Sequence, residues 1–315
     1  MGVKYTYHKS IAIVLRALAS TKIRIDAHPD EVLMIPSRDA NRSIKAHVYY
    51  PTNKDEKPGP VLINFCGSGF VLRMFGTDDE YCRHVAKNTE HTVIDVQYRL
   101  APEHPFPAAF NDAQDVVTWV RAQPQFDLEH VSLSGFSAGA NIALAVSSSS
   151  PRFNTRGNEN VFRTVMSFYG PTDMALPTPE KPQADNTNFI IRKIFPPFSH
   201  LCHKCLSMGK VDPADPRISP KFADPSDFPD NVIFITAAQD PFAIEAENLA
   251  EAIRAVEGKT VACERMDECA HGWDKEAIRG TSQCQAKDAA YALAVGVLNR
   301  GGAEAAFGGE SKVDA

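Results

Sequence analysis

A serine lies at the centre of a short motif bounded by glycines. Residues 135–139 read Gly-Phe-Ser-Ala-Gly, with Ser137 in the middle. An apolar run at 131–134 precedes the motif, and a helix-forming run begins at Ala138. A serine held on a sharp turn between a strand and a helix needs glycine-sized neighbours, because the two elements pass close together. This context predicts a nucleophile at Ser137, with an ordinary tight turn as the alternative.

A serine nucleophile needs a general base, because its hydroxyl is a weak nucleophile at neutral pH. His271 is the one histidine after Gly139 that also follows an acid at the end of a predicted strand. It stands in a loop after the predicted strand at 260–266. The alternative is that His271 lies on the surface or is a hydrogen-bonded histidine of the core. The position of His271 in the order serine, acid, histidine favours it as the base.

The third member of such a site is an acid that orients the histidine. Asp240 directly follows the apolar run at 232–238, which places its carboxylate at the carboxyl end of a strand. Ligand chemistry in open α/β sheets gathers at those ends. We therefore predict Asp240 as the orienting acid, and a helix N-cap is the alternative role. The competing carboxylates are Glu245 in the following helix and Asp267 and Glu268 close to His271.

Acyl transfer also requires backbone N–H groups that bind the developing oxyanion. In a nucleophile elbow one donor comes from the residue after the serine, here Ala138. The other donors come from the loop after the third predicted strand, which reads Phe-Cys-Gly-Ser-Gly-Phe at 65–70. We expect the N–H groups of Ser68 and Gly69 to serve, although this glycine run by itself fits a plain turn equally well.

Strand-like and helix-like runs alternate along the chain and must position these residues. This alternation predicts an α/β fold with a mostly parallel sheet of eight strands and helices on both faces. The strand-like runs lie at 31–35, 43–50, 60–65, 91–98, 131–134, 161–168, 232–237 and 260–266, and the helix-like runs lie at 108–121, 138–147, 244–256 and 281–298.

Two segments fall outside this alternation. The proline-rich interval 172–230 is too long for a simple connection, so we expect a cap inserted between core segments at 31–171 and 231–300. The apolar cluster within 189–198 could cover a site, dock the insertion on the core, or do both. Residues 1–30 are predicted to form an N-terminal helix, and residues 301–315 a disordered tail.

The N-terminal run permits two other readings. A charged residue, Arg16, interrupts its apolar stretch too early for a signal peptide, so an amphipathic helix is the better interpretation. Residues 1–6 fit the short myristoylation pattern, and one acyl chain would anchor the protein only weakly. No stretch approaches the roughly 18 apolar residues of a membrane span.

The length and composition are typical of a globular protein. It has 315 residues, of which 43% are hydrophobic and 23% charged, with a net charge of −6, which argues against a nucleic-acid-binding surface. The seven cysteines lack the spacing of a disulfide framework, so we expect buried thiols and a cytoplasmic location. The His and Cys residues within 199–205 have the density of a zinc site, but no second ligand pair follows them. We expect no cofactor or metal.

Several motifs in this order resemble the hormone-sensitive-lipase-like esterases, also called bacterial family IV. The family has His-Gly-Gly-Gly before a Gly-Asp-Ser-Ala-Gly elbow. Further matches are the segment 98–109, similar to the family's YRLAPE-x-PFPAA, the segment 215–220, similar to DPRISP, and the triplets at 240–242 and 271–273. The resemblance is greatest to fungal members such as esterases of versiconal hemiacetal acetate type. It implies an α/β-hydrolase fold, a helical cap made of the N-terminal cap helix (1–30) and the insertion at 172–230, and short- to medium-acyl ester substrates.

Three positions depart from the family pattern. Cys66 replaces the histidine that supports the oxyanion loop, Ser68 replaces the middle glycine, and Phe136 replaces the aspartate before the nucleophile.

Taken together, the motifs and the resemblance predict a serine carboxylesterase that acts through an acyl-enzyme on an apolar ester. One candidate substrate is an acetate ester of a fungal polyketide. A lyase, dehydratase or cyclase on the same scaffold is the alternative. A binding protein is less favoured because it needs no triad, and a homodimer is an open option.

Overall fold

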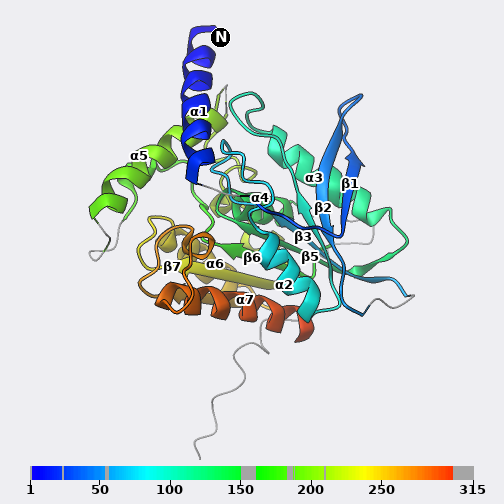
Figure 1. Cartoon of the computed structure of the whole chain (residues 1–315). Helices are drawn as coiled ribbons and strands as arrows, with labels where there is room; N and C mark the ends of the chain where they lie inside the picture. The colour runs from blue at the N-terminus through cyan, green and yellow to red at the C-terminus, as the bar shows by residue number, and fades with distance from the viewer. Residues whose placement is uncertain are drawn as a thin grey trace, which may run out of the picture.

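An eight-stranded sheet runs through the molecule (Figure 1). The computed structural model describes residues 2–22, 25–53, 57–149, 161–182, 187, 189–208 and 211–300. The strand order is β1-β2-β4-β3-β5-β6-β7-β8. The strands are β1 (Glu31–Pro36), β2 (Ser43–Tyr49), β3 (Gly59–Phe65), β4 (Thr92–Val96), β5 (Phe126–Phe136), β6 (Thr164–Phe168), β7 (Asn231–Ala237) and β8 (Thr260–Met266).

The sheet is parallel from β4 onward, whereas β2 pairs antiparallel with both β1 and β4. The inner strands β6 and β7 are buried along their whole length. Continuous apolar runs of this kind are typical of parallel strands covered on both faces. The predicted mostly parallel, eight-stranded α/β fold is therefore confirmed.

Helices cover both faces of the sheet. On one face, α3 (Ala108–Arg121), α4 (Ala138–Ser147) and α6 (Ala243–Arg254) share a hydrophobic core with the inward side chains of the strands. On the other face, α2 (Asp79–Asn88) and α7 (Ser282–Arg300) share a second core. The sequence analysis did not identify α2, because only Tyr81, Cys82, Val85 and Ala86 of this polar segment are buried.

Two further helices lie together outside the two layers (Figure 1). These are α1 (Gly2–Lys22), in the segment predicted as the N-terminal helix, and α5 (Phe189–Leu206), within the predicted insertion at 172–230. The α5 helix contains Pro196 and Pro197, although proline inside a helix removes backbone hydrogen bonds. Ala12 of α1 is fully buried in a small cluster with Cys202 and Cys205 of α5. The first helix therefore supports the second.

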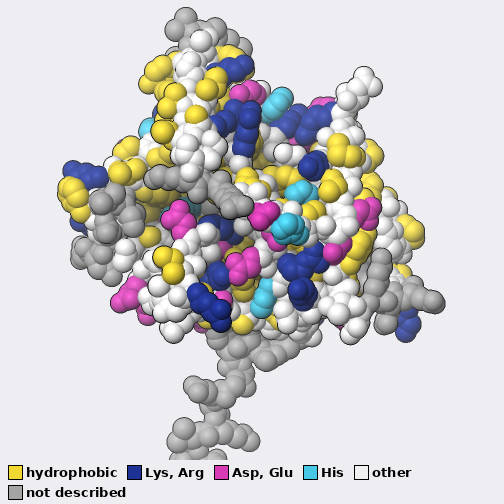
Figure 2. Space-filling view, in the orientation of Figure 1, with side chains coloured by type: hydrophobic (Ala, Val, Ile, Leu, Met, Phe, Trp, Pro, Cys, Tyr) yellow, Lys and Arg dark blue, Asp and Glu magenta, His cyan; other side chains and the backbone are white. Residues whose placement is uncertain are grey.

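The surface of α1 also exposes apolar side chains. Ile13, Val14 and Leu18 are each more than half exposed, and Figure 2 shows apolar side chains along the visible side of this helix. Among the described residues, no helix has the length and apolarity needed to cross a bilayer.

All seven cysteines are free thiols, five of them buried. The predicted tail at 301–315 lies outside the described residues.

Candidate active site

Ser137 occupies a strained turn between β5 and α4. Its backbone has φ 51° and ψ −117°, a conformation that non-glycine residues rarely adopt. A Cβ atom on Gly135 would lie 2.3 Å from the carbonyl oxygen of Gly139, and one on Gly139 would lie 1.9 Å from that of Phe65. Only glycine fits at either position. The glycines of the motif therefore let the strand and the helix approach closely enough to present the serine.

Three side chains from distant parts of the chain form a continuous hydrogen-bonded relay. Oγ of Ser137 lies 2.7 Å from Nε2 of His271, and Nδ1 of His271 lies 2.6 Å from Oδ2 of Asp240. A carboxylate accepts hydrogen bonds, so Nδ1–H donates to Asp240 and leaves Nε2 free to accept the serine proton. The structure thus brings all three predicted residues together in the order that proton transfer from the serine requires.

Asp240 is held in place by the turn between β7 and α6. The residue is 4% exposed, and its Oδ1 accepts a hydrogen bond from the backbone N–H of Phe242 at 3.0 Å. Phe242 itself is the N-cap residue of α6. Of the competing carboxylates, Glu245 accepts from the Thr172 N–H and pairs with Lys181, whereas Asp267 and Glu268 are exposed. Only Asp240, among these four, contacts the histidine.

The loop that follows β3 lies against the nucleophile. Ser68, Gly69 and Ala138, the three predicted oxyanion donors, line one cavity together with Ser137 and His271. Gly69 has φ 55°, and a Cβ there would lie 3.2 Å from Sγ of Cys202 on α5. A left-handed backbone and this close approach both favour glycine at position 69. The insertion helix therefore packs directly on the predicted oxyanion loop.

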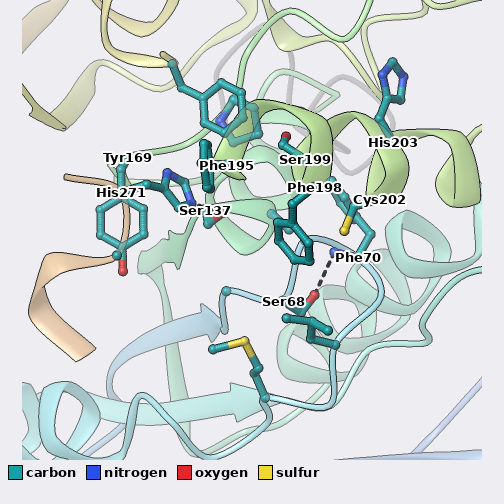
Figure 3. A pocket seen from close by; sticks show the side chains of 18 of the residues that line it. Ser68, Phe70, Ser137, Tyr169, Phe195, Phe198, Ser199, Cys202, His203 and His271 are labelled. Carbon is teal, nitrogen blue, oxygen red and sulfur yellow. Dashed lines mark hydrogen bonds between the residues drawn. The ribbon is translucent and has the colours of Figure 1, made fainter. Parts of the chain in front are cut away.

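Aromatic rings surround the histidine within this cavity (Figure 3). The ring centroid of His271 lies 4.6 Å from that of Phe195, 4.9 Å from that of Tyr169 and 5.4 Å from that of Phe242. Phe195 comes from α5, so the insertion contributes directly to the site. The cavity has a volume of about 130 Å³, and most of the side chains that line it are apolar. Such a lining favours an apolar substrate group beside the reacting atoms.

Tyr169 is a site residue that the sequence analysis did not identify. It follows β6 immediately and has φ 41°, and its hydroxyl donates to Oδ1 of Asp274 at 2.6 Å. Tyr169 occupies the same carboxyl edge of the sheet as Ser137 and Asp240. The strand-end rule that selected Asp240 could therefore have selected this tyrosine as well.

Lys275 is a second such residue, and it packs against Phe136. Its ammonium lies 2.8 Å from carboxylate oxygens of both Asp78 and Asp274, and 3.6 Å from the centroid of the Phe136 ring. Burial lowers the pKa of Lys275, but the charges of Asp274 and Asp78 outweigh burial and raise it. The charged ammonium of Lys275 thus packs on the ring of Phe136, at the position where the family that this sequence resembles has an aspartate.

A neighbouring carboxylate belongs to the same buried group. Asp95 on β4 is fully buried, and Asn64 donates hydrogen bonds to both Asp95 and Asp78 at 2.9 Å. Burial and the nearby charge of Asp78 raise the pKa of Asp95 to about 8. This upward shift reflects the cost of burying two carboxylates on either side of Asn64.

The dense His and Cys segment within 199–205 lies on α5. Cys202 and Cys205 are buried against α1, whereas His203 lines the cavity. Burial lowers the pKa of His203 to about 4, so its ring is neutral at physiological pH. In the part of the chain that the structure describes, no three His, Cys, Asp or Glu side chains are arranged to hold a metal ion.

Comparison with known proteins relates the chain to a group of esterases. LipN, a carboxylic ester hydrolase of Mycobacterium tuberculosis, is 32% identical over 221 residues, which cover 68% of this chain and 57% of LipN. The carboxylesterase NlhH of the same organism is 29% identical and covers 75% of this chain and 72% of its own. The mycobacterial esterase LipI is 40% identical over 107 residues.

The first curated relatives are matched over only part of their length. The chain spans 33% of LipI and 57% of LipN, less than two thirds of either.

Solved structures match this chain over more of their length. An esterase of Pyrobaculum calidifontis superposes with a TM-score of 0.73 at 24% identity, covering 95% of this chain and 94% of its own. The carboxylesterase EstE1 from a metagenomic library gives 0.74 at 23% identity, with 93% and 97% covered.

A family model described as the alpha/beta hydrolase fold matches residues 62–275. That interval contains the elbow at Ser137, the predicted oxyanion loop, Asp240 and His271. It also contains the strands from β4 to β8 and the insertion helix α5. The chain therefore belongs to the α/β-hydrolase-fold family.

Proposed function

We propose that this protein is a serine carboxylic ester hydrolase. The observation that carries the proposal is the relay from Ser137 through His271 to Asp240, with contacts of 2.7 and 2.6 Å. Relatives that are named esterases or carboxylesterases support the same reaction class. A binding protein would have no need of a base and an acid in this register.

The relay performs the reaction in two halves. Oγ of Ser137 attacks the ester carbonyl carbon while its proton passes to Nε2 of His271. The bond to the leaving alcohol then breaks, and the alcohol takes that proton, which leaves an acyl group on Ser137. Water attacks this acyl-enzyme in the same manner and releases the acid. Asp240 stabilises the imidazolium in both halves, and the N–H groups of Ser68, Gly69 and Ala138 bind the oxyanion.

The size of the cavity supports short acyl groups. Its volume of about 130 Å³ is slightly below the ~150 Å³ of an apolar cavity that holds one benzene ring. A short chain or a single ring fits beside the serine. We expect para-nitrophenyl acetate and butyrate to be hydrolysed with higher kcat/KM than the decanoate. The narrower substrate, an acetate ester of a fungal polyketide, would belong to the same class.

Covalent labelling tests the proposal. A fluorophosphonate should phosphonylate Ser137 of the native protein, and Ser137→Ala should lose both labelling and esterase turnover by at least about 10⁴-fold. Ser149→Ala, a change of a serine beyond the far end of α4, should label and turn over normally. Labelling that survives in Ser137→Ala would refute the assignment. Labelling without turnover of any ester would favour the lyase or cyclase alternative.

A further inference from the structure

Ser68 occupies a position where the family that this sequence resembles has a glycine. The residue is 2% exposed, and its hydroxyl forms two hydrogen bonds within the loop region. Oγ of Ser68 lies 2.7 Å from the hydroxyl of Tyr98, and it accepts from the backbone N–H of Phe70 at 2.9 Å. The hydroxyl of Tyr98 in turn donates to the carbonyl oxygen of Cys66 at 2.6 Å.

The direction of each of these hydrogen bonds follows from counting protons. Burial raises the pKa of Tyr98 well above its ordinary value, so its hydroxyl keeps its single proton. That proton is donated to the Cys66 carbonyl, so the hydroxyl of Ser68 must donate to the oxygen of Tyr98. The oxygen of Ser68 then accepts the Phe70 N–H. The result is one directional chain that ties residue 70 to residue 66 across the loop.

This hydrogen-bond chain spans a backbone that needs support. Gly69 and Phe70 both have positive φ, 55° and 62°, and the second is a bulky residue for which this conformation is strained. A strained segment persists only when its surroundings fix it. Two further backbone contacts help, since the Ala101 N–H donates to the Phe70 carbonyl at 2.8 Å and the Leu72 N–H donates to that of Ser68 at 2.8 Å.

We infer that Ser68 is a positioning residue whose hydroxyl, through Tyr98, aims the N–H groups of Ser68 and Gly69 at the oxyanion. The inference rests on the proposed esterase function. In the resembling family a histidine side chain supports this loop, whereas here position 66 contributes its carbonyl group and not its thiol. The two differences from the family pattern, serine at 68 and cysteine at 66, therefore belong together. The hydroxyl of Ser68 supplies the support for the loop that the imidazole of a histidine at 66 would give.

The test removes the hydroxyl and keeps the backbone N–H. Ser68→Ala should lower kcat by about tenfold to a hundredfold with KM within about twofold, because a misaimed donor weakens binding of the transition state and not of the ester. Tyr98→Phe, which breaks the same chain at its next link, should have an effect of similar size. The double variant should be no slower than the slower single variant, because both changes remove one unit.

Two controls separate positioning from damage to the fold. Titration with a fluorophosphonate counts competent sites, so kcat is expressed per labelled serine. A phenylboronate, which places an oxygen of its tetrahedral adduct near the oxyanion donors, should bind Ser68→Ala more weakly by a factor similar to the loss in kcat. If the native protein is not labelled at Ser137, the proposed function itself fails.

The positioning role is overturned if labelled Ser68→Ala turns over within twofold of the native enzyme, or if its whole loss lies in KM. Additive losses in the double variant would also overturn it. Should Ser68→Ala be recovered unfolded, Tyr98→Phe carries the same expectation, and an unchanged kcat in that variant overturns the role equally.

Discussion

The carboxylate of Asp240 lies 2.6 Å from Nδ1 of His271, although the two residues are 31 positions apart and follow different strands. Asp240 ends the turn after β7, and His271 stands in the loop after β8. Because β7 and β8 are parallel neighbours, their carboxyl ends lie side by side, and the two loops meet there. The same edge of the sheet carries Ser137 at the end of β5.

Replacing Asp240 by asparagine should leave the fold intact and reduce kcat by about 10⁴-fold. Oδ1 accepts the N–H of Phe242, so the NH2 group of asparagine would face Nδ1 and donate to it. The histidine would then carry its proton on Nε2, the tautomer that cannot accept the serine proton. Ester hydrolysis measured at neutral pH checks this. Asp267→Asn, a change of an exposed carboxylate near the histidine, is the matched control. If both variants lost activity equally, Asp240 would have no special role.

Cys66→Ala should slow the enzyme by less than tenfold, or under about 1.4 kcal/mol of barrier. The thiol is buried, burial raises its pKa, and the hydrogen bond from Tyr98 goes to the backbone carbonyl, which alanine keeps. Steady-state kinetics on a short aryl ester measure the effect.

Ser68→Pro should cost at least about a hundredfold in kcat, because proline deletes one predicted oxyanion donor. Circular dichroism should confirm that the variant is folded. The reverse ranking, with Cys66→Ala inactive and Ser68→Pro tolerated, would mean that the thiol takes part in the chemistry and that another reaction is the better hypothesis.

Deleting residues 1 to about 25 should reduce activity on hexanoate esters more than on acetate esters. Ala12 of α1 packs on the insertion helix α5, and α5 supplies Phe195 and Phe198 to the cavity. Arg16 fixes α1 through an ion pair with Glu103 at 2.9 Å. Loss of this support should loosen the apolar wall that longer acyl groups need.

The ratio of kcat/KM for the two esters is the measurement for this deletion. Arg16→Ala is a milder variant that should shift the ratio in the same direction. An equal loss on both esters would show that α1 supports the fold and not the substrate site.

The stability of Asp95→Asn relative to the native protein should increase as pH rises from about 6 to 8. In an unfolded chain aspartate ionises near pH 4, whereas in the folded protein the pKa of Asp95 is about 8. Between these values the folded state holds one more proton, so the native free energy of unfolding falls with rising pH. Asparagine lacks this dependence.

The expected difference grows by up to about 1.4 kcal/mol for each pH unit and levels off above pH 8. Urea unfolding of both proteins at several pH values measures it. The exposed replacement Asp267→Asn serves as the control for general charge effects. A stability difference that stays constant over this range would show that Asp95 is ionised in the folded state.

The local sequence determines much of this molecule. Apolar runs of strand length, separated by helical patterns, predict the eight strands, because burial of a parallel sheet requires continuous apolar segments. The glycines at 135 and 139 are also readable from the sequence, since a serine on a tight elbow leaves no space for a Cβ on either side. The order serine, acid, histidine then selects the three residues that the fold brings together.

Tertiary structure alone decides which groups support those residues. Tyr98 reaches Ser68 and Cys66 from the loop after β4, and Lys275 reaches Phe136 from the loop after β8. No periodicity encodes these contacts, because they depend on which strands are neighbours and on where their loops end. The insertion helix illustrates the same limit. Its two prolines argue against a helix locally, and its packing on α1 and on the loop at Gly69 appears only when the segments are placed together in space.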